Sequence, residues 1–481
     1  MNPFVIAVDI GTTSTKVLAV TATGDVLAQH QVYYPTFYPQ PGFAEQDANE
    51  ILAAVVSGLK TIESQIDLSK VVALAFSSAM HSVVAVNKKC ETLTPLIIWA
   101  DTRSSVQAKA LRHTVTGIEL HQQNGTPVHP MSPLCKLMWF RVNEPEIHSH
   151  AFKFISIKEF VWYHLTGEFS IDYSLASATG LFNIHNHIWN KTALELAGIT
   201  PQQLSNPVPV THQAKLKVVK DLAGYQHIPL VIGASDGCLA QLGSDAMQLG
   251  VLTVTLGTSG AVRRSATRNL SDPQSRLFNY ILTNTETVAG GATNNGTAVM
   301  DWFVKEFSGA EKLPAIVAQV CKKIPAGSDG LLALPFLQGE RAPIYKAEAR
   351  GVFFNISMQH TQQHFARALL EAICFELKWI TESVETVCGP SVKVVVSGGI
   401  THFPEWVQML ADVLDREVIV SSNHDASAMG AARLAFQTIE VTFVSAAEMH
   451  TIFTPHANNA HVYAAVYTRF KALYQTVEKL F

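Results

Sequence analysis

The feature that most constrains the fold is a short glycine–threonine turn that occurs twice, each time between two apolar segments. In the first half of the chain, the apolar segment 4–8 is followed by Gly11-Thr12-Thr13 and a second apolar segment. In the second half, segment 251–256 is followed by Gly257-Thr258-Ser259-Gly260 and another apolar segment. Apolar segments joined by such turns are typical of β-hairpins. Because the two turns stand about half the chain length apart, we interpret them as an internal duplication, although a chance pairing gives the same pattern.

The segments around each hairpin predict α/β structure in both halves. After the first hairpin, a third strand and a helix starting after Asp47 precede a buried strand at 71–76. In the second half we predict strands at 284–288, 331–334 and 392–396, and helices at 297–307, 361–388, 403–414 and 426–436. The division between the halves is expected near residues 243–250.

Composition excludes several classes of protein. The 481 residues are enough for two domains, and 48% of them are hydrophobic, which favours large buried sheets. A net charge of −4 without a run of Lys or Arg argues against a nucleic-acid binder. We find neither an export leader nor a membrane-spanning segment, and the six cysteines form no C-x-x-C pair. We therefore expect a cytoplasmic protein with reduced thiols and small-molecule partners.

The glycine–threonine turns are candidate phosphate-binding sites. Each offers backbone N–H groups and hydroxyls in one place, and two matched turns could hold a phosphate chain from both sides. The chain has no Gly-Lys dipeptide and no G-x-G, so Walker, Rossmann and protein-kinase phosphate loops are excluded. Asp9, beside the first turn, is a candidate carboxylate for Mg²⁺ through water. Alternatively, Asp9 satisfies the amides of its own turn.

Asp236 is the candidate general base. It follows the apolar run 229–232 and precedes a helical stretch, so it should lie where the cleft of an α/β fold opens. Phosphoryl transfer to an alcohol needs a carboxylate that accepts the hydroxyl proton. The alternative is a helix N-cap, a position that Asp also favours, and the two roles are compatible.

Other motifs at strand ends are candidates for ligand contact. Met80-His81 and Trp99-Ala-Asp101-Thr-Arg103 could bind hydroxyl groups, although a buried His is more often structural. Ser397-Gly398-Gly399 and the helix around Gly430 would suit an adenine site, but each is also a common packing device.

Taken in order along the chain, these motifs resemble the FGGY family of carbohydrate kinases from Asp9 to about Leu434. The motifs that carry the resemblance are Asp9-Ile-Gly-Thr-Thr-Ser-Thr-Lys16, Met80-His81, Trp99-Ala-Asp-Thr-Arg103, Met131-Ser-Pro-Leu-Cys-Lys-Leu-Met-Trp139, Gly-Ala-Ser-Asp236-Gly, Leu256-Gly-Thr-Ser259, Gly339-Glu-Arg-Ala-Pro343, Ala349-Arg-Gly351 and Ser397-Gly-Gly399.

The resemblance implies a specific fold and site. The fold class is α/β with two actin-like (ribonuclease H-like) domains, a duplicated βββαβαβα order and ATP in the interdomain cleft. Residues 1–246 would bind the sugar and carry the first hairpin and the catalytic Asp236, and residues 247–481 would carry the second hairpin and the adenine site. Asp9 would lie beside Mg²⁺. The expected ATP contacts are Thr12, Thr13, Ser14, Lys16, Gly257, Thr258, Gly296, Gly398, Gly399 and Gly430. The expected sugar contacts are Met80, His81, Trp99, Asp101, Arg103, Met131, Lys158 and Asp236.

The resemblance also implies a substrate. Segments 78–82, 125–133 and 177–181 are similar to gluconate kinases of the family, and Ser78-Ala79 replaces the Gly-Gln usual in xylulose kinases. The expected reaction is ATP-dependent phosphorylation of D-gluconate to 6-phosphogluconate. Lys158 is then a candidate counter-charge for the substrate carboxylate, or else a surface lysine at a helix start. Open alternatives are a kinase for xylulose or another ketose or polyol, and a non-catalytic actin-like ATP-binding sensor. A homodimer is a possible assembly.

Overall fold

The computed structural model describes residues 3–217, 219–267, 270, 272–309, 312–420, 425–444 and 450–481. The chain forms two compact units. The first consists of Met1–Asp245, Ala266–Val288 and Asp425–Ala447, and the second of Ala246–Ser265, Ala289–His424 and Glu448–Phe481. Each unit combines stretches that are far apart in the sequence, and the predicted domain boundary between residues 246 and 247 stays a prediction.

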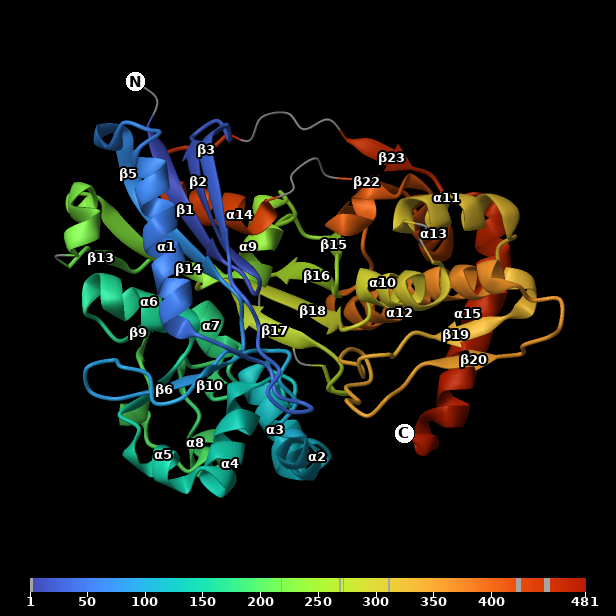
Figure 1. Cartoon of the computed structure of the whole chain (residues 1–481), viewed down its shortest axis with the longest axis horizontal. Coiled ribbons are helices and arrows are strands. Elements are labelled where there is room, and N and C mark those ends of the chain that lie inside the picture. The colour runs from blue at the N-terminus through green and yellow to red at the C-terminus, as the bar shows by residue number, and fades with distance from the viewer. Residues whose placement is uncertain are drawn as a thin grey trace. The chain divides into compact units, whose positions relative to one another are not determined.

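The first unit is built on a six-stranded sheet with the order β13-β14-β5-β1-β2-β3 (Figure 1). Strands β1 and β2 form the predicted antiparallel hairpin, β1 pairs in parallel with β5, and β5 pairs in parallel with β14. The apolar central strands are buried because helices cover the sheet. The bounds are β1 Phe4–Ile10, β2 Ser14–Thr21, β3 Val26–Tyr33, β5 Val71–Ser78, β13 Gln213–Lys215 and β14 Pro229–Ser235.

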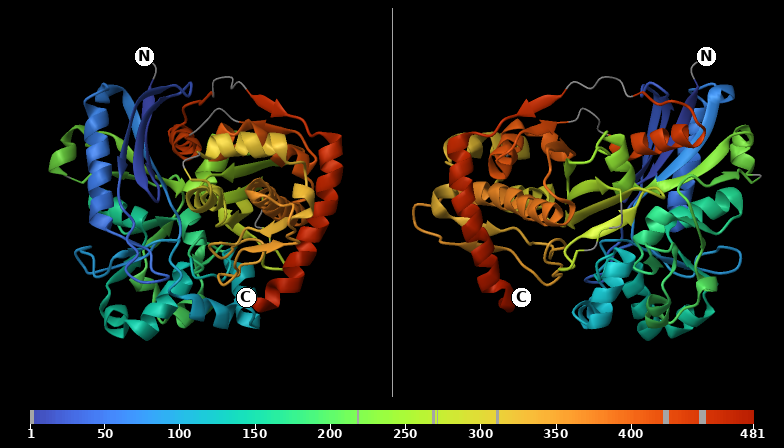
Figure 2. Two further views of the ribbon diagram at one scale, coloured as in Figure 1. Left: turned by 45° about the vertical axis from the view of Figure 1, so that its right-hand side comes forward. Right: turned by 180° about the vertical axis from the view of Figure 1, so that it is seen from behind.

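Helices α1 (Ala48–Glu63), α14 (Ala426–Thr438) and α9 (Asp236–Gly243) are among those that pack on this sheet. Helix α1 begins as predicted after Asp47, whose side chain accepts a hydrogen bond from Asn49 N, and lies against β2 and β3. At Gly58 a β-carbon would lie 2.7 Å from a methyl of Val17, so glycine permits the close approach of α1 to β2. Helix α14 lies against β1 and β5 and is visible beside the first strands from behind in Figure 2. Helix α9 packs on α14.

The rest of the first unit is a helical region with short strand pairs. Its separate hydrophobic core includes Leu137, Phe140 and Phe154. The helices are α2 Ser105–Arg112, α3 Val115–Asn124, α4 Pro133–Asn143, α5 Pro145–His150, α6 Ile157–Thr166, α7 Tyr173–Ser177 and α8 Lys191–Ala197. The strands are β4 Glu45–Gln46 with β7 Leu96–Ile97, β6 Val84–Val86 with β8 Lys153–Ile155, β9 Ser170–Asp172 with β12 Asn206–Val208, and β10 Phe182–Asn183 with β11 Ile188–Trp189. Strand β17 (Phe278–Ile281) also belongs to this unit.

The second unit repeats the sheet plan of the first. Its strands follow the order β18-β16-β15-β21-β22-β23. Strands β15 and β16 form an antiparallel hairpin, β15 pairs in parallel with β21, and β21 pairs in parallel with β22. Each pairing has its counterpart in the first unit, so the predicted duplication is confirmed. The bounds are β15 Val251–Leu256, β16 Gly260–Ala266, β18 Thr287–Thr293, β21 Lys393–Ser397, β22 Val418–Val420 and β23 Thr451–Phe453.

Within its described residues, the second unit has helices at the three predicted positions 297–307, 361–388 and 403–414, and two further helices that were not predicted from the sequence. They are α10 Thr297–Phe307, α11 Leu313–Lys323, α12 Gln362–Cys388, α13 Pro404–Leu414 and α15 Ala457–Val477, with the strand pair β19 Leu332–Leu334 and β20 Val352–Phe354. The strand predicted at 284–288 is wrong in its position, because β18 begins only at Thr287. The preceding residues form a turn in which Leu282 N donates to Glu286 O and the Thr283 hydroxyl accepts from Glu286 N.

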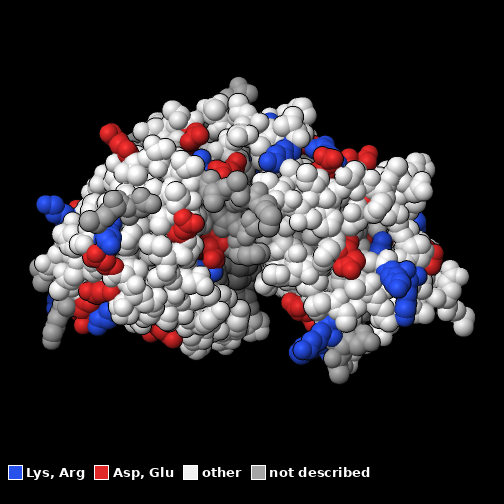
Figure 3. Space-filling view, turned by 90° about the horizontal axis from the view of Figure 1, so that it is seen from above, with Lys and Arg blue, Asp and Glu red and all other residues white. Residues whose placement is uncertain are grey.

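Charged side chains show no clustering by sign on the face drawn in Figure 3, and cysteines show no disulfide pairing among the described residues. Basic and acidic side chains are instead interspersed on that face. All six cysteines are free thiols. Within the described ranges, no helix combines the length and the apolar character that crossing a bilayer requires.

Candidate functional site

The first hairpin turn contains predicted phosphate-binding residues, and hydrogen bonds from Trp99 and Gln46 fix its position. Gly11 N donates to Ser14 O at 3.0 Å, which closes the turn. The indole N–H of Trp99 donates to Thr12 Oγ1 at 2.9 Å, and Gln46 Nε2 donates to Thr12 O at 2.6 Å. Thr13 is exposed at the tip. The turn is thus a preformed polar loop, and Trp99 supports it from a predicted sugar-binding motif.

Asp9 lies at the centre of a charged cluster within the first unit. On the sheet it stands opposite Lys16 on β2 and Ser77 on β5. Asp9 Oδ2 accepts a hydrogen bond from the Ser427 hydroxyl at 2.6 Å, and Lys16 forms an ion pair with Asp425. Burial raises the pKa of Asp9, although the Ser427 and Ser77 hydroxyls and the Lys16 charge oppose this shift.

The chemistry of this cluster fits a bound cation. Asp9 Oδ1 is buried and has no hydrogen-bond partner among the described residues. An unpartnered buried carboxylate oxygen is costly in an apolar site and is a suitable ligand for Mg²⁺ or for a water bound to it. The contacts of Asp9 are with β2, β5 and α14 rather than with its own turn amides, so the turn-satisfying alternative is not supported. Sequence reasoning missed Asp425 and Ser427, because no local pattern connects them to Asp9.

Asp236 is the first residue of α9. The N-cap of that helix is Ser235, whose hydroxyl accepts from Cys238 N at 3.4 Å, so the alternative role of Asp236 as the cap is wrong. Asp236 is partly buried, and its Oδ1 accepts from Gly237 N at 2.7 Å. A carboxylate in the first turn of a helix is stabilised by the helix dipole. Strand β14 aligns Ser235 with Ser78 on β5, so Asp236 and the Met80-His81 loop start from the same sheet edge.

The loop that carries Met80 and His81 is fixed by buried hydrogen bonds. His81 has a left-handed backbone with φ 68°, and its Nδ1 donates to Ala178 O at 2.8 Å. Its Nε2 lies 3.5 Å from the Tyr280 hydroxyl. Lys136 Nζ donates to His81 O at 2.6 Å and to Ile98 O at 2.7 Å, and burial lowers the pKa of this lysine to about 7. Lys136, which the sequence did not single out, therefore joins the His81 loop to the segment before Trp99.

Asp101 and Arg103 form a buried ion pair. The Arg103 guanidinium contacts Asp101 Oδ2 at 2.8 Å and Glu45 Oε1 at 2.6 Å, and it lies over the ring of Phe43. Asp101 also accepts from Ala44 N at 2.7 Å. These contacts are all with the protein, so both residues shape the loop, and their predicted contact with sugar stays a prediction. Met131 is buried, and Met80 is partly buried.

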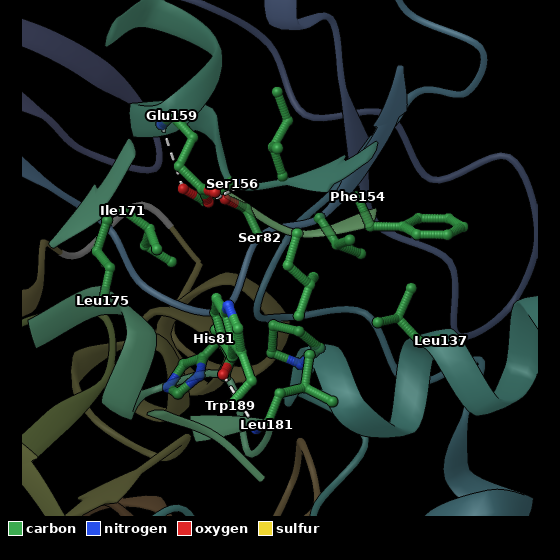
Figure 4. A pocket seen from close by; sticks show the side chains of 15 residues that line it. His81, Ser82, Leu137, Phe154, Ser156, Glu159, Ile171, Leu175, Leu181 and Trp189 are labelled. Carbon is green, nitrogen blue, oxygen red and sulfur yellow. Dashed lines mark hydrogen bonds between the residues drawn. The ribbon is translucent and has the colours of Figure 1, made fainter. Parts of the chain in front are cut away.

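A small cavity lies behind His81 (Figure 4). It extends past Ser82 to Glu159 and Ser156 on one side and to Leu181 and Trp189 on the other, with a volume of about 20 Å³. That volume holds roughly one water molecule, so this cavity is not a sugar site. Burial raises the pKa of Glu159 to about 7, although Glu159 accepts from Ser156 N at 2.6 Å in the capping box of α6.

Lys158 is not the surface lysine that one interpretation of the sequence predicted. It is 2% exposed, and its Nζ lies 2.7 Å from Asp172 Oδ2 and donates to Ala234 O at 3.0 Å. Asp172 therefore already balances its charge. A role for Lys158 as the counter-charge of a substrate stays a prediction, and its pairing counts against it.

In the second unit, the predicted glycines converge on the second hairpin. Gly257 N donates to Ser259 O at 2.9 Å, and Thr258 is exposed as Thr13 is in the first hairpin. A β-carbon on Gly296 would lie 2.3 Å from Gly257 O, and one on Gly398 would lie 2.7 Å from Leu256 O. Both glycines therefore permit backbone to pack on the hairpin. Gly399 follows at ordinary contact distance.

Gly430 is placed elsewhere. It lies in α14, which belongs to the first unit, whereas Gly398 and Gly399 belong to the second. A β-carbon at Gly430 would lie 2.0 Å from Leu239 O on α9, so this glycine permits the two helices to cross closely. The structure therefore supports the role of Gly430 in helix packing that the sequence left open. Contact of Gly430 with nucleotide stays a prediction.

Comparison with known proteins agrees with this arrangement. Residues 4–243 match the N-terminal domain of the FGGY family of carbohydrate kinases, and residues 252–439 match its C-terminal domain. A gluconokinase from Bacillus subtilis is 38% identical over 447 residues, which cover 90% of this chain and 87% of that protein. A xylulose kinase from Staphylococcus epidermidis is 28% identical over 490 residues, covering 99% and 97%.

Solved structures give the same result. A ligand-bound xylulose kinase and a gluconate kinase, both from Lactobacillus acidophilus, each superpose with a TM-score of 0.93 at 28% identity, covering 99% of this chain and 98% of theirs. With both family domains matched in order and the actin-like sheet plan present twice, the chain belongs to the FGGY family of carbohydrate kinases.

Proposed function

We propose that this chain transfers the γ-phosphoryl group of ATP to a hydroxyl of D-gluconate, giving 6-phosphogluconate. The observation that carries the proposal is the place of Asp236, at the start of α9, with the helix cap supplied by Ser235. Its carboxylate would accept the hydroxyl proton as the new oxygen–phosphorus bond forms and the bond to the β-phosphate oxygen breaks. The choice of gluconate rests on the 38% identity with the gluconokinase from Bacillus subtilis.

The remaining groups have roles in binding. The two hairpin turns would hold the phosphates, with backbone N–H groups and hydroxyls at Thr12, Thr13, Ser14, Gly257 and Thr258, assisted by Lys16. Asp9 would hold Mg²⁺ through water, and the ion would neutralise charge on the phosphates. The loops around His81 and Trp99 would bind sugar hydroxyls, together with Met80, Met131, Asp101 and Arg103. Gly296, Gly398, Gly399 and Gly430 would adjoin the nucleotide.

The domain division, the place of the ATP site and the cellular location are proposed from the sequence. We propose that residues 1–246 and 247–481 are the two family domains, that ATP binds between them and that the enzyme is cytoplasmic. A homodimer stays a prediction. Both units repeat one sheet plan, which supports a phosphate clamp formed by two duplicated hairpins.

A second candidate function is a kinase for xylulose or another ketose or polyol. The ligand-bound xylulose kinase from Lactobacillus acidophilus superposes as well as the gluconate kinase does, at a TM-score of 0.93 for each, so fold similarity does not separate the two. A non-catalytic ATP-binding sensor is disfavoured because a carboxylate stands at the position that a base would occupy.

The test is a coupled assay of ADP release with MgATP and D-gluconate, D-xylulose, a pentitol, glycerol or no sugar. We expect rapid turnover with gluconate and a kcat/KM for it at least about tenfold above that for any other compound. Faster turnover with xylulose would instead assign the ketose kinase. ADP release that is independent of every added sugar would favour the sensor and reject the kinase.

A further inference from the structure

The buried lysine of the first unit is attached to the turn that presents Asp236. Lys158 Nζ donates to the carbonyl of Ala234 at 3.0 Å, and Ala234 stands two residues before Asp236. A buried ammonium is expensive unless it is paired and hydrogen-bonded. Here Asp172, which is fully buried, lies 2.7 Å away. Burial lowers the pKa of Lys158, but Asp172 opposes that shift, and the paired side chain touches the predicted catalytic turn.

Asp172 connects the same turn through a second route. Its Oδ1 accepts from Leu175 N at 3.0 Å and so caps helix α7. Ser174 lies in this helix, two residues after Asp172. Its hydroxyl is 2.9 Å from the Ser235 hydroxyl, and Ser235 N donates to Ser174 Oγ at 3.2 Å. The two residues directly before Asp236 are thus each held by a buried polar group, one from α6 and one from α7.

The charges that face Lys158 are also known. They are Asp172 at the end of β9, Glu159 on α6 and Asp236 on α9. Because Asp172 balances the cation and solvent does not reach it, Lys158 is poorly placed to bind an incoming carboxylate. It is well placed to hold Ala234 and to favour the charged form of Asp236, since a nearby cation stabilises a carboxylate.

We propose that Lys158, with Asp172 as its counter-ion, is a positioning residue for Asp236 and does not contact the substrate. This inference rests on the proposed function of Asp236 as the base. Lys158 fixes the backbone of the turn, and Ser174 fixes the cap residue, so the carboxylate is held in the orientation that accepts a proton. A displacement of about 1 Å at such a site is enough to lower the rate by roughly a hundredfold.

The test compares Lys158→Met with the wild type. We expect kcat to fall by roughly tenfold to a hundredfold with the KM for gluconate unchanged within about threefold. We also expect the acid limb of the kcat–pH profile to move to higher pH, because loss of the cation raises the pKa of the base. The double variant K158M/D172N, which leaves no unpaired buried charge, gives the same measurements if the single variant does not fold.

The matched control is Lys136→Met. Lys136 is equally buried and also donates to backbone carbonyls, but to those of His81 and Ile98. We expect K136M to raise the KM for sugar and to leave the acid limb in place.

A raised KM for gluconate with unchanged kcat in K158M would make Lys158 a reader of the substrate carboxylate and overturn the proposal. An acid limb that moves equally in K158M and K136M would also overturn it, since any buried lysine would then suffice. Wild-type protein without sugar-dependent turnover would reject the proposed function itself, and the inference with it. Normal wild-type turnover with an unaltered K158M would reject the inference alone.

Discussion

The hydroxyl of Ser427 donates a hydrogen bond to Asp9 Oδ2 at 2.6 Å, although 418 residues separate the two in the chain. Helix α14 therefore returns to the first strand and supplies a donor to the buried carboxylate. The other oxygen, Oδ1, is left without a partner in the described part of the chain. One oxygen of this carboxylate is thus stabilised by the protein, and the other is the atom that the proposed Mg²⁺ or a water bound to it would contact.

Replacing Asp9 by Asn is expected to separate activity from stability. Asn keeps the shape and accepts the Ser427 hydrogen bond but removes the charge, so kcat/KM should fall at least about a hundredfold, roughly 2.7 kcal/mol. Because burial opposes the charge of Asp9, the free energy of unfolding should not decrease. Initial rates over a Mg²⁺ titration and thermal unfolding of both proteins check this. A variant with normal Mg²⁺ dependence would exclude Asp9 from the cation site.

Replacing Asp236 by Asn is expected to abolish turnover and spare nucleotide binding. A general base contributes about 10²–10⁴-fold to the rate, so kcat should fall within that range or further. The carboxylate does not cap α9, and the fold should therefore be retained. Single-turnover kinetics and ADP calorimetry give the two quantities. More than about a tenth of wild-type kcat would contradict the role of Asp236 as the base.

Two of the predicted nucleotide-binding glycines are expected to respond differently to Ala. At Gly430 the new β-carbon would meet Leu239 O at 2.0 Å, so G430A should lower the free energy of unfolding by about 1–3 kcal/mol. At Gly399 the nearest atom lies 3.8 Å away, and G399A should change stability by less than about 0.5 kcal/mol. Urea unfolding measures both. If Gly399 adjoins the nucleotide, G399A should still weaken ATP binding, which calorimetry would detect.

Glu376 is expected to make the second unit less stable as pH rises. It is fully buried, and burial together with the charge of Glu340 raises its pKa well above the usual 4.5. The native state then keeps a proton that the unfolded chain has lost, so stability falls as pH increases from 4.5 towards the raised pKa. In Glu376→Gln the side-chain amide is still a hydrogen-bond donor towards Glu340, but it does not titrate. E376Q should therefore lose less stability than the wild type between about pH 5 and about pH 9.

The measurement for Glu376 is urea unfolding of both proteins across that pH range. Contributions from groups that do not interact with Glu376 are common to the pair, so the difference between the two curves isolates Glu376 together with its neighbour Glu340. Parallel curves would show that Glu376 does not keep its proton. Glu340 also accepts hydrogen bonds from Thr293 and Asn295, which precede Gly296. A change in the ionisation of this pair would therefore act on the segment next to a predicted nucleotide contact.

Local patterns were sufficient for much of the fold. Strand β15 and helix α10 have the bounds that alternation, periodicity and turn residues predict, because neighbouring residues decide those features. The strand predicted at 284–288 failed because a turn closed by Thr283 and Glu286 competed with an apolar pattern too short to distinguish them. For Asp236, the sequence left a helix cap open as an alternative role, and only the geometry identifies the adjacent Ser235 as the cap.

The sequence by itself determined the duplicated hairpins, several of the strands and helices around them, and the family, since each depends on residues close together or on motifs read in order. Only the tertiary structure decided the partners of charged groups. It buried Lys158 against Asp172 and Ala234, brought Ser427 to Asp9 and set Gly430 against α9. Burial and electrostatic pairing depend on which distant segments meet in space, and no local pattern of residues records that.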